Sequence, residues 1–285
     1  SATTAAGGVS SETIYIGACG WELMEDFEGC PDHYSCQQTS TSPFEQWSCV
    51  SDGTDPSLPA TITVPNEEQW LTHRDAYKDC RGWLDMTGNV GSRKGAIFNI
   101  DQSLNPGNVK LRFWISTGQC PYPTTEGEVC YNSFCDADGF AASVYYVQTT
   151  DELEAALNLT QTGGGLGYSI PSGGFDSFHI EFDTYHNGYD PHPGDHIAIM
   201  TNSDNATHHL VYPATQSSAF ELEDNRWHEI ILEIQGSDIT VDYDSERVIT
   251  GSIDGFEFKG GYIGFSGTTG YCYNYHRFDD LSYQP

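Results

Sequence analysis

The stretch FHIEFDTYHNGYDPHPGDHIAIMTNS, residues 178–203, carries five potential metal ligands within sixteen residues. Apolar and polar residues alternate from 178 to 183, and a period of two places alternate side chains on the same face of a β-strand. Two carboxylates of this segment should therefore point in the same direction. The five residues are Glu181, Asp183, Asn187, Asp190 and His196.

The residues that follow this strand should form a loop that returns to it. The segment from Asn187 to Asp195 is rich in Gly, Pro, Asn and Asp, which are typical of turns, and His196 opens the next apolar run. Carboxylates gathered at one place repel one another unless a cation neutralises them. Oxygen ligands with one histidine suit calcium, manganese or magnesium better than zinc. The stretch predicts a divalent-metal site; the simpler interpretation is a set of solvated loop acids.

The order of these residues resembles the metal-binding segment of the legume, or L-type, lectins: Glu-x-Asp-x-Tyr-x-Asn-x-x-Asp, with His six residues later. Four further segments resemble blocks of the same family and follow in the same order. Together the five blocks cover most of residues 82–283. The four are GSRKGAIF at 91–98, ADGFA at 137–141, GGGLGY at 163–168 and GFSGTTG at 264–270.

The resemblance implies an all-β fold, a concanavalin A-like antiparallel β-sandwich (jelly roll), after a cysteine-rich N-terminal extension. It also implies bound Ca²⁺ and a second divalent metal, usually Mn²⁺ in that family. Asp195 lengthens the gap before His196 by one residue relative to the common family pattern, which weakens the case for the second metal. Calcium would be held by Asp183, the Tyr185 carbonyl, Asn187 and Asp190, and the second metal by Glu181, Asp183, Asp190 and His196.

The same resemblance implies a carbohydrate site beside the metals. The Ala137-Asp138 peptide is typically cis in the family, and its aspartate accepts hydrogen bonds from sugar hydroxyls. Cys272, after the late turn, is foreign to the plant proteins and suggests a rebuilt specificity loop. The implied sugar contacts are the Asp138 carboxylate, the N–H of Gly164, the Asn187 amide, the stacking ring of Tyr185 and, on the rim, Tyr271.

Alternating apolar residues predict further antiparallel strands with one buried face. The clearest are residues 109–115, 230–234 and 239–243, the last two joined by a Gly-Ser-Asp turn. Helical signals are confined to residues 151–157 and 67–76.

Residues 57–285 are predicted to form the lectin-like domain, and residues 1–56 an N-terminal arm and cysteine-rich extension. Residues 12–17 are a strand candidate that could add to the sheet of a neighbouring subunit. Such a contact, repeated between subunits, forms a ring or a filament. The alternative function is therefore a structural subunit of an extracellular filament or surface assembly built on a lectin-like sandwich.

Nine cysteines and two N-glycosylation sequons, at Asn158 and Asn205, predict a secreted glycoprotein from an oxidising compartment. The first residues, SATTAAGGVSS, lack the features of a signal peptide and favour a mature N-terminus. The cysteines at 120, 130 and 135 share one loop in which a local bridge is expected, and Cys80 with Cys272 is a plausible long-range pair. Spacing alone does not fix the pairing, and an odd total leaves at least one cysteine without a partner in the chain.

The charge balance excludes two classes of partner. With 41 acidic and 11 basic residues, the formal charge of −30 repels nucleic acid and anionic membranes. No apolar run approaches the length of about 18 residues that spans a bilayer. Histidines outside the metal stretch, among them His33, His73, His208 and His209, are predicted to be surface residues.

An enzymatic alternative is a glycoside hydrolase of the laminarinase type, which shares the jelly roll and carries Glu-x-Asp-x-x-Glu or Glu-x-Asp-x-Glu on one strand. Glu181 and Asp183 match the first two positions. Tyr185 and His186 stand where the second glutamate should be, so the acid/base pair of a retaining mechanism is missing. We therefore expect a secreted, metal-dependent, non-catalytic protein that binds glycans or glycoproteins and self-associates through its N-terminal arm.

Overall fold

The computed structural model describes, with side chains, residues 70–77, 83–100, 103–124, 130, 135–171, 175–217 and 219–284. It describes the backbone alone for residues 13–16, 22–25, 34–38, 46–51, 61–65 and 78. Predictions that concern residues 1–12, Cys19, Cys30, His33 and Cys80 lie outside the described residues.

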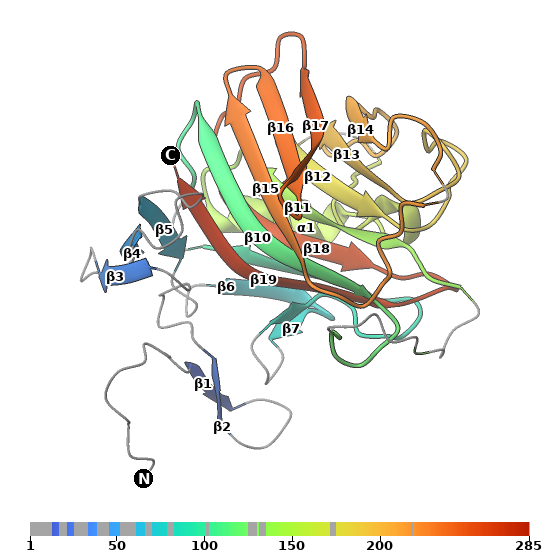
Figure 1. The fold of residues 1–285 in the computed structure, drawn as a ribbon, viewed down its shortest axis with the longest axis horizontal. Coiled ribbons are helices and arrows are strands. Elements are labelled where there is room, and N and C mark those ends of the chain that lie inside the picture. The colour runs from blue at the N-terminus through green and yellow to red at the C-terminus, as the bar shows by residue number, and fades with distance from the viewer. Residues whose placement is uncertain are drawn as a thin grey trace.

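Two antiparallel β-sheets pack face to face and form a sandwich (Figure 1). The predicted strands at 109–115, 230–234 and 239–243 all lie in the larger sheet, and the predicted all-β sandwich is confirmed. The ten-stranded sheet follows the order β17 (Glu246–Ser252), β16 (Asp238–Tyr243), β15 (His228–Gln235), β10 (Val109–Gly118), β19 (Tyr275–Gln284), β5 (Thr61–Pro65), β4 (Gln46–Ser51) and β3 (Tyr34–Gln38), with β7 (Tyr77–Lys78) and β8 (Leu84–Asp85) paired beside β19. The seven-stranded sheet follows the order β14 (Leu210–Tyr212), β13 (His196–Thr201), β12 (Ser177–Asp183), β11 (Gly139–Tyr145), β18 (Tyr262–Thr268), β9 (Lys94–Asn99) and β6 (Trp70–Arg74).

Some N-terminal strands extend the sandwich, and others form a separate two-stranded sheet. Strands β3 and β4 extend the ten-stranded sheet through β5. Strand β1 (Thr13–Ile16) falls within the predicted segment 12–17 and pairs with β2 (Glu22–Glu25) of the same chain. The division at residue 56 and the exchange of this strand between subunits stay predictions.

Aromatic side chains from both sheets fill the space between them. The rings of Phe265 and Phe278 stack with centroids 4.0 Å apart, and those of Phe140 and Phe182 with centroids 5.0 Å apart. Phe113 of β10 packs edge-on against Phe265 at 5.5 Å. All five are fully buried, and each contributes roughly 1.5–3 kcal/mol through removal of its apolar surface from water. This core fixes the face of β12 that points inward.

The register of four neighbouring strands brings the predicted site together at one end of the seven-stranded sheet. Gly139 of β11 lies opposite Asp183 of β12 on one side and Thr268 of β18 on the other. Asp183 in turn lies opposite His196 of β13. The ADGFA block, the metal stretch and the late glycine turn therefore meet at the same end of these strands.

One α-helix, α1 (Thr150–Leu159), confirms the helix predicted at 151–157. Thr149 and Glu152 form a capping box at its start. The buried Lys94 of β9 closes its end, because its ammonium donates to the carbonyl oxygens of Leu157 (3.0 Å) and Thr160 (2.5 Å). This helix is too short to cross a membrane, and no other helix of the described residues is long and apolar enough to do so.

The helix predicted at 67–76 is wrong. Its described part contains strand β6, which pairs with β9 along its whole length, from Trp70 opposite Asn99 to Arg74 opposite Gly95. Trp70 stacks on Phe265 of the core with centroids 6.3 Å apart. Pairing and burial of the aromatic ring outweigh the local helical preference.

Two disulfides connect the loops near the site. Cys120–Cys130 is the local bridge that the sequence led us to expect. The partner of Cys272 is Cys135, so the pairing of Cys272 with Cys80 is wrong. Cys135 lies three residues before Asp138 and Cys272 directly follows Tyr271, so this bridge joins the two loops that carry predicted sugar contacts.

Candidate metal and carbohydrate site

Glu181 and Asp183 lie on the face of β12 that points away from the sandwich core. The neighbouring Phe182 belongs to the core, as the alternation predicted. The outer face is covered by Leu166 and Tyr168, which follow the short 3₁₀ turn η2 (Gly163–Gly165). The carboxylates are therefore buried beneath the glycine loop.

Glu181 has three polar partners around its buried carboxylate. The hydroxyl of Tyr168 donates to Oε2 at 2.5 Å. The Nε2 atoms of His208 and His196 lie 3.1 Å and 3.6 Å from Oε1. Burial alone would raise the pKa of Glu181, but the nearby imidazoles of His196 and His208 lower it below its ordinary value. Glu181 is thus held as a carboxylate.

Asp183, Asp190 and His196 form a second group, whose potential ligand atoms lie within 4.8 Å of one another. Burial, and then the negative charges of Glu181 and Asp190, raise the pKa of Asp183 well above its ordinary value. Burial also raises the pKa of Asp190. A divalent cation at this position would favour the ionised forms and reverse both shifts.

The loop after β12 turns back over these carboxylates. The backbone N–H of Tyr185 donates to Asp183 Oδ1 at 2.8 Å, and the backbone N–H of Asn187 donates to the carboxylate of Asp190. The Nδ2 of Asn187 donates to the carbonyl oxygen of Tyr185 at 3.1 Å. All four predicted calcium ligands therefore lie in one cluster.

The donor atoms present fit both metals. Among the described residues, Asp190 Oδ1 and His196 Nε2 are buried without a hydrogen-bond partner, as expected for atoms that serve as ligands. A set of carboxylate, carbonyl and amide oxygens suits calcium. A set that adds imidazole suits a transition metal.

Asp138 lies next to this cluster, between two glycine turns. The Ala137-Asp138 peptide is cis, as the resemblance led us to expect. A β-carbon added at Gly270 would lie 3.0 Å from Oδ2 of Asp138, and one at Gly163 would lie 3.8 Å from its Oδ1. Burial raises the pKa of Asp138 to about 6, and Oδ2 has no hydrogen-bond partner among the described residues. A hydroxyl-rich ligand could supply the missing donors.

The remaining predicted sugar contacts lie in loops that adjoin Asp138, and they differ in exposure. Gly164 faces the Asn187 side chain, because an added β-carbon would lie 2.6 Å from Asn187 Nδ2. Tyr185 and Tyr271 are 42% and 84% exposed, so both residues are accessible to a ligand. The assignment of these five residues to a sugar site stays a prediction.

Three residues near the site were missed or misjudged from the sequence. His208, predicted to be on the surface, has a side chain only 8% exposed and contacts Glu181. Tyr168 was included only as part of a glycine loop, although its hydroxyl bonds to Glu181. Asp195, which lengthens the loop, turns away and accepts the backbone N–H of Leu222 at 2.7 Å, so His196 still reaches Asp190.

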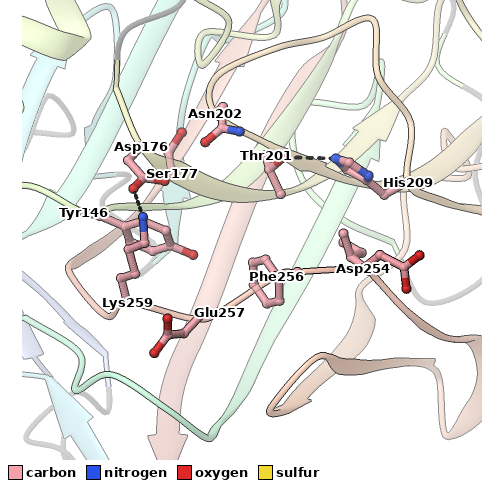
Figure 2. A pocket seen from close by; sticks show the side chains of 12 residues that line it. Tyr146, Asp176, Ser177, Thr201, Asn202, His209, Asp254, Phe256, Glu257 and Lys259 are labelled. Carbon is pink, nitrogen blue, oxygen red and sulfur yellow. Dashed lines mark hydrogen bonds and ion pairs between the residues drawn. The ribbon is translucent and has the colours of Figure 1, made fainter.

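A cavity of about 500 Å³ lies at the opposite ends of the same strands (Figure 2). Tyr146, Ser177 and Thr201, at or next to the other ends of β11, β12 and β13, line it. Asp176 and Lys259 form an ion pair across part of its wall. It contains none of the predicted site residues, so it is separate from the metal cluster.

The fold is that of the L-type lectins, which confirms the resemblance at the level of the fold. Basic winged bean lectin, in a crystal structure with Tn-antigen, matches with a TM-score of 0.57 and 20% identity over 76% of this chain and 92% of that one. The exoplasmic/lumenal domain of VIP36 in a Ca²⁺- and mannose-bound form matches with a TM-score of 0.53 and 14% identity over 78% and 84%. Lectin I-B4 from Griffonia simplicifolia, in a metal-free form, matches with a TM-score of 0.55 and 16% identity over 76% and 93%.

No protein-family model and no curated protein matches the sequence. At 20% identity or less, the structural matches establish the fold and leave the ligand to be argued from the residues of this chain.

Proposed function

We propose that the chain is a non-catalytic carbohydrate-binding protein whose site requires Ca²⁺ and a second divalent metal. Asp183, the Tyr185 carbonyl, Asn187 and Asp190 would hold the calcium. Glu181, Asp183, Asp190 and His196 would hold the second metal, for which Mn²⁺ is the first candidate. The bound metals would neutralise the buried carboxylates and fix the loop that presents Tyr185 and Asn187.

The observation that carries the proposal is the position of Asp138. Its carboxylate is buried between the Gly163 and Gly270 turns, and one of its oxygens lacks a hydrogen-bond donor among the described residues. A buried carboxylate without a donor is costly, and sugar hydroxyls would supply donors. The exposed ring of Tyr185 would stack on the apolar face of a pyranose, while Tyr271 would contact it at the rim.

The surroundings of Glu181 argue against a hydrolase. A glycosidase needs a second carboxylate placed across the scissile bond, but Tyr185 and His186 occupy the equivalent positions. Glu181 itself is 1% exposed and contacts Tyr168, His196 and His208. This burial shields Glu181 from a glycan and supports the proposal that it binds a metal.

We further propose that the protein works outside the cytosol, in the secretory pathway or in the extracellular space. The two disulfides near the site support this location, since such bonds persist in oxidising compartments. Glycans or glycoproteins would be its partners there.

A glycan array tests the proposal with four samples: the wild type with Ca²⁺ and Mn²⁺, the wild type after chelation, Asp138→Asn, and Asp176→Asn. Asp176 is the matched control, because it is an acid of the distant cavity. We expect metal-dependent binding of a defined sugar class by the wild type and by Asp176→Asn, and its loss in folded Asp138→Asn. Retention of binding by Asp138→Asn would remove the assigned site.

A further inference from the structure

His208 sits in the metal cluster although the resemblance assigns it no role. It lies in the loop between β13 and β14, and its Nε2 is 3.1 Å from Glu181 Oε1. Its ring centroid is 5.5 Å from that of His196. Potential ligand atoms of Glu181, His196 and His208 lie within 4.8 Å of one another, and this group shares His196 with the group of Asp183 and Asp190. The two groups adjoin one another at His196.

We propose that His208 is a direct ligand of the second metal, and that the metal thereby holds the 202–209 loop, which in turn positions the glycine loop of the sugar site. The inference rests on the proposed function. It extends the donor set from three carboxylates and one imidazole to three carboxylates and two imidazoles. The five ligands are Glu181, Asp183, Asp190, His196 and His208.

A second imidazole changes which metal the site favours. Imidazole suits zinc, cobalt, nickel and copper, whereas sites built of carboxylates, carbonyls and water suit manganese and magnesium. The affinity gained from His208 should therefore be larger for Co²⁺ and Zn²⁺ than for Mn²⁺. This preference separates the proposed cluster from one with a single histidine.

The loop that carries His208 also contacts the glycine loop. The Nδ2 atom of Asn205 donates to the carbonyl oxygen of Gly164 at 2.8 Å, and it also donates to the hydroxyl of Tyr189 at 2.9 Å. That hydroxyl donates to the same Gly164 oxygen at 2.9 Å. Asn205 is three residues from His208, so fixing His208 restricts the donor that holds Gly164.

The short segment between the two residues has internal support. Asp204 accepts the backbone N–H of Ala206 at 2.8 Å and the hydroxyl of Thr207 at 2.7 Å. These bonds make a compact turn of residues 204–207. The connection from the metal to Gly164 therefore runs through an ordered turn.

The neighbouring histidine provides a matched control. His209 shares a hydrogen bond of 2.9 Å with the hydroxyl of Thr201 and lines the distant cavity (Figure 2). The two adjacent side chains therefore differ in their contacts, because His208 reaches Glu181 and His209 reaches Thr201. His209→Ala should leave the metal site unchanged.

Calorimetric titrations test the ligand role in the full chain, first freed of metals and then saturated with Ca²⁺. Co²⁺, Zn²⁺ and Mn²⁺ are each titrated into the wild type, His208→Ala and His209→Ala. We expect His208→Ala to lose tenfold or more in Co²⁺ and Zn²⁺ affinity and less in Mn²⁺ affinity, with His209→Ala equal to the wild type. Pulsed EPR of the wild type loaded with Cu²⁺ should detect two coordinated imidazoles, and this measurement does not depend on the folding of a variant.

The outcomes separate this inference from the proposed function. The role of His208 is overturned if the wild type binds metal tightly and His208→Ala binds it with the same affinities. It is also overturned if EPR detects one coordinated imidazole. Both outcomes leave the lectin proposal standing. If the wild type binds Ca²⁺ and glycans but no transition metal, Glu181 and His208 form an ion pair without a metal, and the inference again fails. Absence of glycan binding in a sample that shows the two-imidazole signal overturns the lectin proposal alone.

Amide hydrogen exchange tests the connection to the glycine loop without a sugar. Addition of Co²⁺ to the Ca²⁺-loaded wild type should slow exchange in residues 202–209 and also in residues 161–168. Asn205→Ala should bind Co²⁺ with unchanged affinity, and Co²⁺ should still slow exchange in residues 202–209. In this variant, Co²⁺ should no longer slow exchange in residues 161–168. Slowing of residues 161–168 in Asn205→Ala would overturn the role of Asn205 as a positioning residue.

Discussion

A β-carbon added at Gly164 would lie 2.6 Å from the Nδ2 atom of Asn187, so these two residues, from different loops, leave no room for a larger side chain between them. The hydroxyl of Tyr189 would also be 2.5 Å from the added carbon. Both obstacles are ends of side chains, so the chain can fold around a methyl group by moving them. The cost would fall on the predicted site, because Asn187 is proposed both as a calcium ligand and as a sugar contact.

We therefore predict that Gly164→Ala folds normally but loses tenfold or more in glycan affinity, which corresponds to about 1.4 kcal/mol. Gly188→Ala is the control, since an added β-carbon there meets nothing within 4 Å. Glycan titrations with both variants, each checked by circular dichroism, measure the effect. Equal affinities in the two variants would show that the Gly164–Asn187 contact does not belong to the site.

The buried carboxylate of Asp138 gives binding a defined pH dependence. Burial raises its pKa from 3.8 to about 6, so its proton-free form, which accepts hydrogen bonds from hydroxyls, is lost as pH falls through about 6. Glycan affinity measured between pH 5 and pH 8 should decrease toward acid. Protonation of metal ligands acts in the same direction, so calcium occupancy is measured at each pH, and the dependence should persist where occupancy is complete.

The same shift predicts the sign of a stability change. Between pH 3.8 and about 6 the folded chain binds more protons at Asp138 than the unfolded chain, so stability contributed by this group falls as pH rises through that window. In metal-free protein at pH 7.5, Asp138→Asn should therefore be at least as stable as the wild type toward urea. A variant markedly less stable than the wild type would contradict the uncompensated burial of this carboxylate.

Alternation and motif order predicted the parts of the site that depend on local sequence. Glu181 and Asp183 share a face because the strand has a period of two, and the glycine turns meet Asp138 where the resemblance places them. The strand at Trp70 was missed because only pairing with β9 and burial against Phe265 decide its conformation.

The contact of His208 with Glu181 could not be predicted, because two adjacent histidines in a loop look equivalent in the sequence. The pairing of β13 with β14 decides between them: Ile199 lies opposite Leu210, and the backbone N–H of His209 donates to the carbonyl oxygen of Ile199 at 3.0 Å. This register directs His208 toward Glu181. The bridge between Cys135 and Cys272 likewise depends on two loops that meet only in the folded chain.

Removal of metals should lower stability measurably. Asp183 has a raised pKa because burial and the charges of Glu181 and Asp190 disfavour its ionised form, and bound metals would relieve this repulsion. A metal present at one hundred times its Kd stabilises the folded state by about 2.7 kcal/mol, which for a chain of this size raises Tm by roughly 4–5 °C. Calorimetry with metals and with chelator should show that difference; identical melting curves would contradict metal binding to this cluster.

The ion pair of Arg277 and Asp85 offers the strongest test of the structure outside the predicted metal and sugar residues. The two groups lie 3.7 Å apart and their side chains are 0% and 1% exposed, and the guanidinium also donates to the Cys120 carbonyl oxygen at 2.7 Å. Asp85→Ala removes a buried counterion from the guanidinium, so it should lower the free energy of unfolding by about 3–5 kcal/mol. Arg93 and Asp75 form a comparable pair at 2.9 Å but are 46% and 32% exposed, so Asp75→Ala should cost less than about 1 kcal/mol. Urea denaturation of both variants measures the two losses, and similar values for the two pairs would show that the Arg277–Asp85 pair is not buried in solution.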